Sequence, residues 1–293
     1  MKRWGYALLL LLGAGSAGAQ TSGPPRLLLN HVYFVLDSVT YHDIEASPFL
    51  AAQFAGREVR TTESGGLRWS GLYFYGRHTY LEILGPNGLP GSQPGDVGIE
   101  LASEVPGGIR SLMQRFGTQH FPFDTLTRTK TDSSGAYPWF LSWRASGPDL
   151  PSDRTALWVM EYSAAIAQRM SKRDSLPESD RSRDRFIATH LVPDQLMAEL
   201  VAATFALPVE DIAKVSRTLD RAGVLVIPEG EGAVIQLEGF NLHLVPAWDR
   251  PGVRKLEFSL NREALANPTY RFGPSSRLRF GPGRIALWEF SLK

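Results

Sequence analysis

The sequence of 293 residues contains no cysteine. This absence excludes disulfide frameworks, cysteine nucleophiles, iron–sulfur clusters and cysteine-ligated zinc sites. If the chain binds a metal ion, the side-chain ligands must therefore be histidine and carboxylate groups.

An excess of charge of one sign is also absent. Lysine and arginine total 31 against 30 aspartate and glutamate residues, which gives a formal net charge of +1. The two signs are interspersed, so the chain has no basic footprint for nucleic acid. The motifs HExxH and GxSxG are missing, and GxGxxG is matched at 13–18, inside the apolar N-terminal segment, so nothing supports a hydrolase or a dinucleotide-binding protein. We therefore expect a small-molecule ligand and no nucleic acid partner.

The sequence also lacks a hydrophobic run long enough to cross a membrane. The apolar run at residues 7–12 is far shorter than the roughly 20 residues that a spanning helix needs. It follows Lys2 and Arg3 and precedes the small residues 17–19, an order typical of a secretory signal peptide rather than a membrane anchor. We expect cleavage after Ala19, export to the periplasm or the extracellular space, and a mature net charge of −1 after loss of two positive residues.

The order strand–helix–strand–strand–strand occurs twice between residues 27 and 162. In the first unit, β-favouring residues predict a strand over 27–37 and helical spacing predicts a helix over 37–54. Three further strands are predicted at 57–62, 69–75 and 79–84. The second unit repeats the order with a strand at 96–105, a helix at 106–116 and strands at 123–131, 137–145 and 156–162.

The C-terminal part shows the same order less completely. A third unit covers 200–246, and a fourth, over 254–292, has little helix. Between the halves, residues 171–185 are dense in charge and predict a solvated connector or the polar start of a helix. The predicted organisation is a signal peptide (1–19), a linker (20–26), an N-terminal domain of two units (27–170), a charged connector (171–196) and a C-terminal half of two units (197–293). The fold class is α+β.

Tandem units of this kind resemble the vicinal oxygen chelate superfamily, which includes glyoxalase I, extradiol dioxygenases and epimerases. The segments LNHVYFVLDSVTY (29–41), SPFL (47–50), RTT (60–62) and WSGLYFYGRHTYLEIL (69–84) also resemble a glyoxalase-like bacterial family of unassigned function. The resemblance covers roughly residues 27–162. It implies that each pair of units forms an incomplete barrel, with the fourth unit abbreviated.

The resemblance also implies a site for a divalent metal. In the superfamily the ligands come from the first and last strands of each unit. His31 and Glu82 match the first-strand histidine and last-strand glutamate of unit one, and Glu100 and Glu161 fall near the corresponding places in unit two. Many superfamily enzymes have histidine where Glu100 stands, so Zn, Mn, Ni and Fe all remain open as the ion. The implied activity is that of a lyase or isomerase acting on a small oxygen-chelating substrate, with Glu82 and Glu161 as candidate catalytic carboxylates.

Structural explanations compete with each assignment. His31 fits a hydrogen-bonded core histidine, and Glu82 fits a salt bridge with Arg60 or Arg77. Glu161 fits an exposed residue of an edge strand. In that case the protein would be a non-catalytic small-molecule binding module of the same fold, and its many aromatic side chains would provide the contacts.

The C-terminal half carries similar polar residues in apolar strands, namely His243, Glu257 and Glu289. Alternation in half-exposed strands places polar residues at such positions without any functional need. We therefore expect a structural second barrel.

Overall fold

The computed structural model describes residues 26–291 except 65, 134 and 265–267. The predicted signal peptide and nearly all of the predicted linker lie outside the described residues, so cleavage and export stay predictions. Within the described part of the chain, every helix is too short or too polar to cross a membrane.

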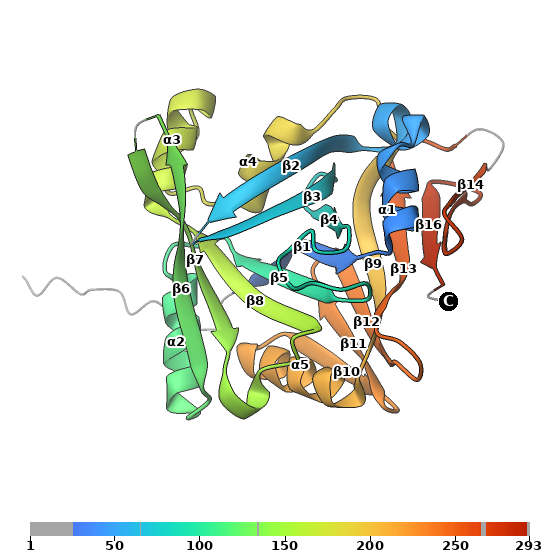
Figure 1. Ribbon diagram of the computed structural model, residues 1–293. Helices are drawn as coiled ribbons and strands as arrows, with labels where there is room; N and C mark the ends of the chain where they lie inside the picture. The colour runs from blue at the N-terminus through green and yellow to red at the C-terminus, as the bar shows by residue number, and fades with distance from the viewer. Residues whose placement is uncertain (1–25, 65, 134, 265–267, 292–293) are drawn as a thin grey trace, which may run out of the picture.

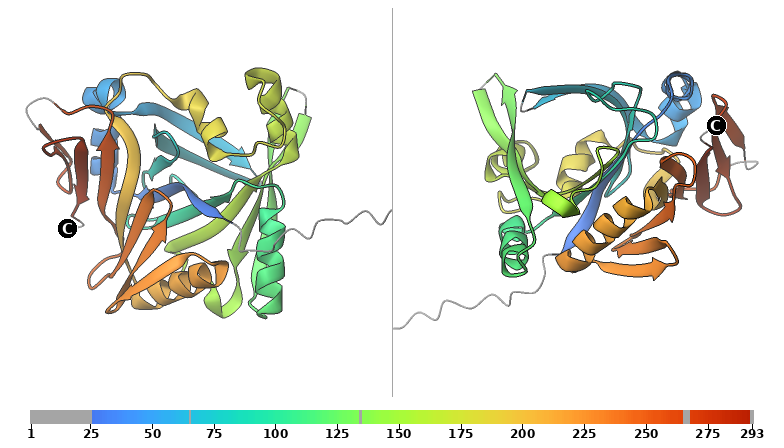
Figure 2. Two further views of the ribbon diagram at one scale, coloured as in Figure 1. Left: turned by 180° about the vertical axis from the view of Figure 1, so that it is seen from behind. Right: turned by 60° about the horizontal axis from the view of Figure 1, so that its bottom comes forward.

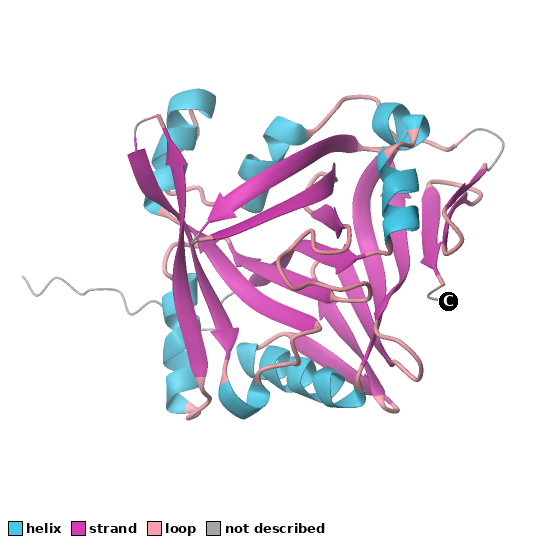
Figure 3. Cartoon of the chain, viewed as in Figure 1, coloured by secondary structure: helices cyan, strands magenta, loops and turns pink. Residues whose placement is uncertain are grey.

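Two eight-stranded sheets form the molecule, and helices lie around them (Figure 1, Figure 3). The first sheet has the order β2-β3-β4-β1-β5-β8-β7-β6, so its two units meet where β1 and β5 pair antiparallel. The right-hand view of Figure 2 shows this sheet curling into a half-barrel. The predicted α+β fold of tandem β-α-β-β-β units is thus confirmed.

The first unit follows the predicted order. Its elements are β1 (Leu27–Val35), α1 (Ser38–Glu45), the π-helical turn η1 (Leu50–Phe54), β2 (Gly56–Ser64), β3 (Leu67–Tyr75) and β4 (Tyr80–Leu84). The helix predicted over 37–54 is interrupted. It begins at the Asp37 cap, whose carboxylate accepts from the Thr40 amide, and α1 stops before Ser47, whose hydroxyl accepts from the Leu50 amide.

The second unit repeats the order around a longer helix. Its elements are β5 (Val97–Ser103), α2 (Gly108–Thr118), β6 (Phe123–Asp132), β7 (Gly135–Ala145), the short 3₁₀ turn η2 (Gly147–Asp149) and β8 (Thr155–Tyr162). Ile109, Leu112 and Phe116 lie on one face of α2 and are fully buried, because they pack on the outer face of the half-barrel beside Trp143.

The C-terminal half builds the second sheet in the order β10-β11-β12-β9-β13-β16-β15-β14. Its first unit contains α5, whereas its second unit has no described helix and is abbreviated as predicted. The elements are β9 (Met197–Leu207), α5 (Val209–Ala222), β10 (Leu225–Glu229), β11 (Gly232–Leu237), β12 (Phe240–Pro246), β13 (Gly252–Leu260), β14 (Thr269–Phe272), β15 (Ser276–Phe280) and β16 (Ile285–Phe290).

One continuous apolar core joins the two sheets. Phe54 and Phe74 of the first half contact Phe258 and Trp288 of the second, with ring centroids 5.4 to 6.0 Å apart. These side chains lie on the outer face of the half-barrel, so the second sheet covers the first from behind.

The segment between the halves differs from the solvated connector that its charges predict. It contains α3 (Ala164–Asp174), α4 (Arg183–Ile187) and the 3₁₀ turn η3 (Ala188–His190). The side chain of Arg185 is only 1% exposed. It donates to the side chains of Asp174 and Ser171 and to the main-chain carbonyls of residues 176, 177 and 180. A buried arginine with satisfied donors gives the segment a fixed shape despite its charge.

Candidate functional site

The inner face of the half-barrel brings together three of the four residues expected at the site. His31 of β1 lies directly opposite Glu100 of β5, and Glu82 of β4 lies beside Tyr33, two positions along β1 from His31. Alternate residues of a strand share one face, so His31 and Tyr33 point to the same side of the sheet. The strand register alone therefore groups the imidazole with both carboxylates.

The imidazole of His31 lies between the two carboxylates. Its Nδ1 is 3.2 Å from Glu100 Oε2 and 3.0 Å from the amide oxygen of Asn30. Both neighbours accept hydrogen bonds, so this geometry assigns the ring proton to Nδ1. The unprotonated Nε2 then faces Glu82 Oε2 at 3.7 Å. Exposed fractions of 4%, 7% and 3% for His31, Glu82 and Glu100 show that all three are buried.

Burial dominates the electrostatics of this group. It lowers the pKa of His31 to about 3, with the charge of Arg60 acting in the same direction, so the ring is neutral. Burial also raises the pKa of Glu82, against hydrogen bonds from Tyr73 and Trp69 and the charge of Arg60. The pKa of Glu100 is raised well above its usual range by burial and by the nearby charge of Glu82. Two buried acids beside a neutral imidazole favour the uptake of a cation, either a proton or a metal ion.

Strand β3 fixes the orientation of Glu82. The Tyr73 hydroxyl donates to Glu82 Oε1 at 2.5 Å, and the Trp69 indole donates to the same oxygen at 2.9 Å. Gly71 lies between these two donors on the same face, and a Cβ there would stand 3.0 Å from Glu82 Oε1. The sequence analysis did not predict Trp69 and Tyr73 as partners of Glu82. The signal that could have found them is the spacing Trp-x-Gly-x-Tyr in a strand that pairs with β4.

The salt bridges proposed as the structural alternative for Glu82 do not form. Arg60 donates to Glu58 and to the Tyr75 hydroxyl, and its guanidinium lies 3.9 Å from the centre of the Tyr73 ring. Arg77 donates to Asn261 in the other half. The charge of Arg60 reaches Glu82 only across the Tyr73 ring.

Glu161 is not brought to this group. Its carboxylate accepts from the Gly107 and Ile109 amides at the start of α2, at 2.8 and 3.1 Å, and from Arg181 at 2.7 Å. On β8, Glu161 pairs with Leu141 and alternates with Met160, so it faces α2 on the outer side of the sheet. Here Glu161 caps a helix, and the predicted catalytic and metal roles have no geometric support.

The place in unit two that corresponds to Glu82 is held by Met160. His31 lies beside Tyr80, and Glu82 is two residues further along β4. In the same way Glu100 lies beside Trp158, and Met160 is two residues further along β8. A thioether thus stands at the position in unit two that mirrors the Glu82 carboxylate.

The residues fit a divalent ion as an incomplete ligand set. Two electron-pair donors, His31 Nε2 and Glu82 Oε2, face each other at 3.7 Å, and donors that each lie about 2.1 Å from one ion are about 3–4 Å apart. Glu100 and Asn30 hold Nδ1–H, which is how carboxylates and carbonyls orient a ligating histidine. Over the described ranges, however, no three histidine or carboxylate side chains are grouped to hold an ion together. The remaining ligands would have to be water or substrate oxygens.

The connector closes one part of the inner face. Ile187 of α4 is fully buried against Tyr73, Tyr75 and Tyr80, and the His190 ring stacks on Tyr75 at 4.3 Å. Phe186 of the same segment stacks on Tyr162 and lies near Trp139. Aromatic side chains therefore line this part of the inner face and the segment that covers it. Trp143 lies on the outer face instead, because a bulge near Trp139 shifts the alternation of β7.

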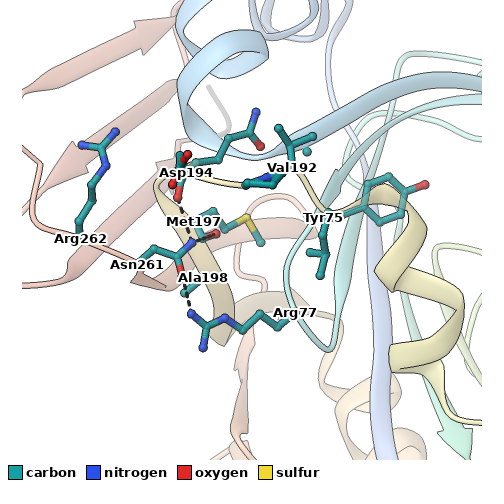
Figure 4. A pocket seen from close by; sticks show the side chains of 12 residues that line it. Tyr75, Arg77, Val192, Asp194, Met197, Ala198, Asn261 and Arg262 are labelled. Atoms are coloured by element: carbon teal, nitrogen blue, oxygen red, sulfur yellow. Dashed lines mark hydrogen bonds between the residues drawn. The ribbon is translucent and has the colours of Figure 1, made fainter.

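A cavity of about 440 Å³ lies at the boundary of the two halves, away from this group (Figure 4). Its lining includes Arg77, Gln195 and Asn261, and none of the four predicted site residues. Figure 4 shows the Tyr75 hydroxyl pointing away from the other labelled side chains. This cavity belongs to the contact between the halves rather than to the histidine–glutamate group.

The polar residues of the second sheet do not form a comparable cluster. Glu289 is held by Arg277 and Arg279, and Glu257 pairs with Lys255. His243 is half-buried on β12. These ion pairs fit the expected structural role of the C-terminal half.

Comparisons with known proteins assign the chain to a family. A family model described as "Family of unknown function (DUF5829)" matches residues 29–290. No curated protein matches the sequence.

Solved structures that resemble the chain include glyoxalase and extradiol dioxygenase proteins. A hypothetical protein from Staphylococcus aureus has a TM-score of 0.49 and 7% identity, with 84% of this chain and 95% of that chain covered. The Mn(II)-bound glyoxalase from Novosphingobium aromaticivorans has a TM-score of 0.43 and 9% identity, with coverage of 89% and 81%. A 2,3-dioxygenase from Pseudomonas sp. KL28 has a TM-score of 0.41 and 11% identity, with coverage of 89% and 90%. Because the family model spans nearly the whole chain, this protein belongs to the family of unknown function DUF5829.

Proposed function

We propose that the half-barrel is the active site of a divalent-metal-dependent lyase or isomerase that acts on a small substrate with neighbouring oxygens. The observation that carries the proposal is the pair of electron-pair donors, His31 Nε2 and Glu82 Oε2, that face each other at 3.7 Å inside a buried acidic group. Two such donors repel unless a cation lies between them.

In this proposal the chain's own residues have separate roles. His31 and Glu82 would hold the ion, while Asn30 and Glu100 keep the imidazole in the tautomer that leaves Nε2 free. A divalent ion held there would act as a Lewis acid toward two substrate oxygens. Glu100 is the remaining carboxylate of the group, and in this proposal it would accept a proton from the substrate and return it. Glu161 takes no part.

Metal analysis of the purified protein tests the proposal. We expect the wild-type chain to bind about one Mn²⁺, Zn²⁺, Ni²⁺ or Fe²⁺ ion, and its Tm to rise when that ion is added. His31→Gln and Glu82→Gln should each weaken ion binding at least tenfold. Glu161→Gln is the matched control, because it neutralises a buried glutamate on the opposite face and should leave ion binding unchanged. A wild-type protein without bound ion and without a thermal shift would overturn the metal role.

A non-catalytic binding module is the second candidate, and the burial of Ile187 favours it. The α4 segment covers a tyrosine-rich part of the inner face, as it would in a protein that holds a ligand rather than turning it over. An enzyme of the proposed type exchanges a substrate proton with solvent. A protein that binds small molecules equally well with and without metal, and catalyses no solvent exchange of their protons, would be a binding module.

Export is the remaining element of the proposal, and it follows from the signal-peptide pattern of residues 1–19. Intact-mass measurement of the chain recovered from a periplasmic or culture fraction tests it. The expected mature N-terminus is Gln20.

A further inference from the structure

Two positive side chains on β6 lack acidic partners. Arg128 and Lys130 are two residues apart on one strand, so they share a face. Both are half-buried, whereas Thr129 between them is exposed, which places the two cations on the inner side of the half-barrel. With the described residues, neither side chain forms a salt bridge or a side-chain hydrogen bond.

The surroundings of Lys130 are aromatic. Its ammonium lies 4.0 Å from the centre of the Trp139 ring and 5.8 Å from that of Phe186. Burial lowers the pKa of Lys130 to about 8, and the charge of Arg60 acts in the same direction while Glu58 opposes it. Cation–π contact compensates only part of the cost of burying an ammonium group.

Arg128 lies within electrostatic range of Glu100. Burial raises the pKa of Glu100, and Arg128 is among the groups that oppose this shift, so the two side chains are close enough to interact electrostatically. Across the half-barrel on β2, the Nε of Arg60 is buried without a hydrogen-bond partner. Arg60, Arg128 and Lys130, on the two edge strands of the sheet, thus have hydrogen-bond donors without an acceptor among the described residues.

Ligand access to this face is supported by the exposure of its side chains. Trp69, Trp158 and Tyr33 on the inner face are half-buried rather than sealed.

We propose that Arg128 and Lys130 bind an oxyanion, the carboxylate or phosphate of a small planar substrate whose other end reaches His31, Glu82 and Glu100. This assignment rests on the proposed function for the reacting end, and it adds the substrate class. A guanidinium fork matches either oxyanion, an ammonium group adds a second donor, and the indoles of Trp139 and Trp158 suit a flat body.

Binding of three matched probes tests the assignment. Benzoate and phenyl phosphate carry the two oxyanions on one ring, and benzamide has the shape of benzoate without its charge. Titrations followed by tryptophan fluorescence and calorimetry should show that wild-type protein binds at least one of the two anions. The anion that binds more tightly identifies the oxyanion. Binding of benzamide as tightly as benzoate, or no binding of either anion, would overturn the assignment.

Variants locate the site. Arg128→Gln and Lys130→Met should each weaken anion binding at least tenfold. Arg110→Gln removes the same charge from an exposed position on α2 and should change nothing. Near-wild-type Tm values would show that the variants are folded. Unchanged binding in both β6 variants contradicts the proposal.

The two proposals fail separately. Anion binding is measured in metal-free protein and in His31→Gln, where it should persist, because the cations on β6 do not need the ion. If metal binding is absent but anions still bind through Arg128 and Lys130, only the metal proposal is lost. If the metal binds but the anion does not, only the substrate class is lost.

Discussion

At the scale of the residue, the face of the sheet on which a side chain lies determines its role. Glu100 and Glu161 are both buried glutamates in apolar strands, yet one contacts His31 and the other caps a helix on the opposite side of the sheet. The carboxylate of Glu100 thus belongs to a polar cluster, whereas that of Glu161 accepts hydrogen bonds from main-chain amides at the start of a helix. The difference arises from strand parity rather than from residue type.

The structure brings His31, Glu82 and Glu100 together, while their metal and catalytic roles stay predictions. The sequence drew attention to these three residues because each is a polar group in an apolar strand. It was not sufficient to place Glu161. In β8 both faces are apolar, with Leu157 and Val159 on one side and Trp158 and Met160 on the other, so no alternation marks the inner side. The spare cations of β6 were missed for another reason: their importance lies in the partners that they lack, which only the structure shows.

The Lys130 ammonium predicts a pH dependence of anion binding. A lysine whose pKa is lowered to about 8 is charged below that pH and neutral above it. Binding of benzoate or phenyl phosphate should therefore weaken as pH rises from 7 to 9. The groups facing Lys130 are Glu58 and Arg60 of β2, Phe186 of α4 and Trp139 of β7, and His190 of η3 is also nearby.

The measurement is a series of calorimetric titrations over this pH range. Lys130→Met should bind more weakly at pH 7 and lose the dependence between pH 7 and 9. A variant that keeps the full wild-type pH profile would show that another group titrates.

At the scale of the element, the best predicted features were strands and amphipathic helices, whose periodicity is local. The order of elements in all four units follows from that periodicity. The connector was harder to predict, because its charges indicate solvent exposure while Arg185 is buried among main-chain carbonyls and Asp174. Partners of this kind depend on how the loop folds back on itself, which residue type does not reveal.

The cap of α2 gives a prediction at this scale. Glu161→Ala removes the acceptor of the Gly107 and Ile109 amides and the partner of Arg181. We expect the free energy of unfolding to fall by about 2 kcal/mol, since the buried Ile109 amide and the half-buried Arg181 guanidinium lose their partner.

Urea denaturation measures this loss. Glu178→Ala, at an exposed position of the connector, is the control and should change stability by less than about 0.5 kcal/mol. Equal midpoints for the two variants would mean that the cap contributes nothing to stability.

At the scale of the whole molecule, the two halves depend on each other for their core. Phe54 and Phe74 pack on Phe258 and Trp288, and Asp211 at the start of α5 accepts from the Ser152 amide and hydroxyl of the first half. The active-site proposal concerns the first sheet only, but the second sheet keeps the apolar back of that sheet away from water.

Truncation tests this dependence. A chain of residues 20–196 should expose the apolar face that the second sheet covers, and it should aggregate or unfold without a cooperative transition. The full-length mature chain should unfold in one transition by calorimetry. A soluble truncated chain with its own sharp transition would show that the first half folds independently.

The thioether of Met160 makes the protein a starting point for a metal-controlled switch. Met160→Glu would set a second carboxylate at the position that mirrors Glu82 across the paired strands. Without an ion, the added buried charge should lower the Tm; with Mn²⁺ or Zn²⁺, the extra ligand should restore it, because ion binding and folding would become coupled. The difference between the Tm values with and without the ion should be larger in Met160→Glu than in wild-type protein. The size of the increase would report how well the half-barrel accommodates a symmetric set of ligands.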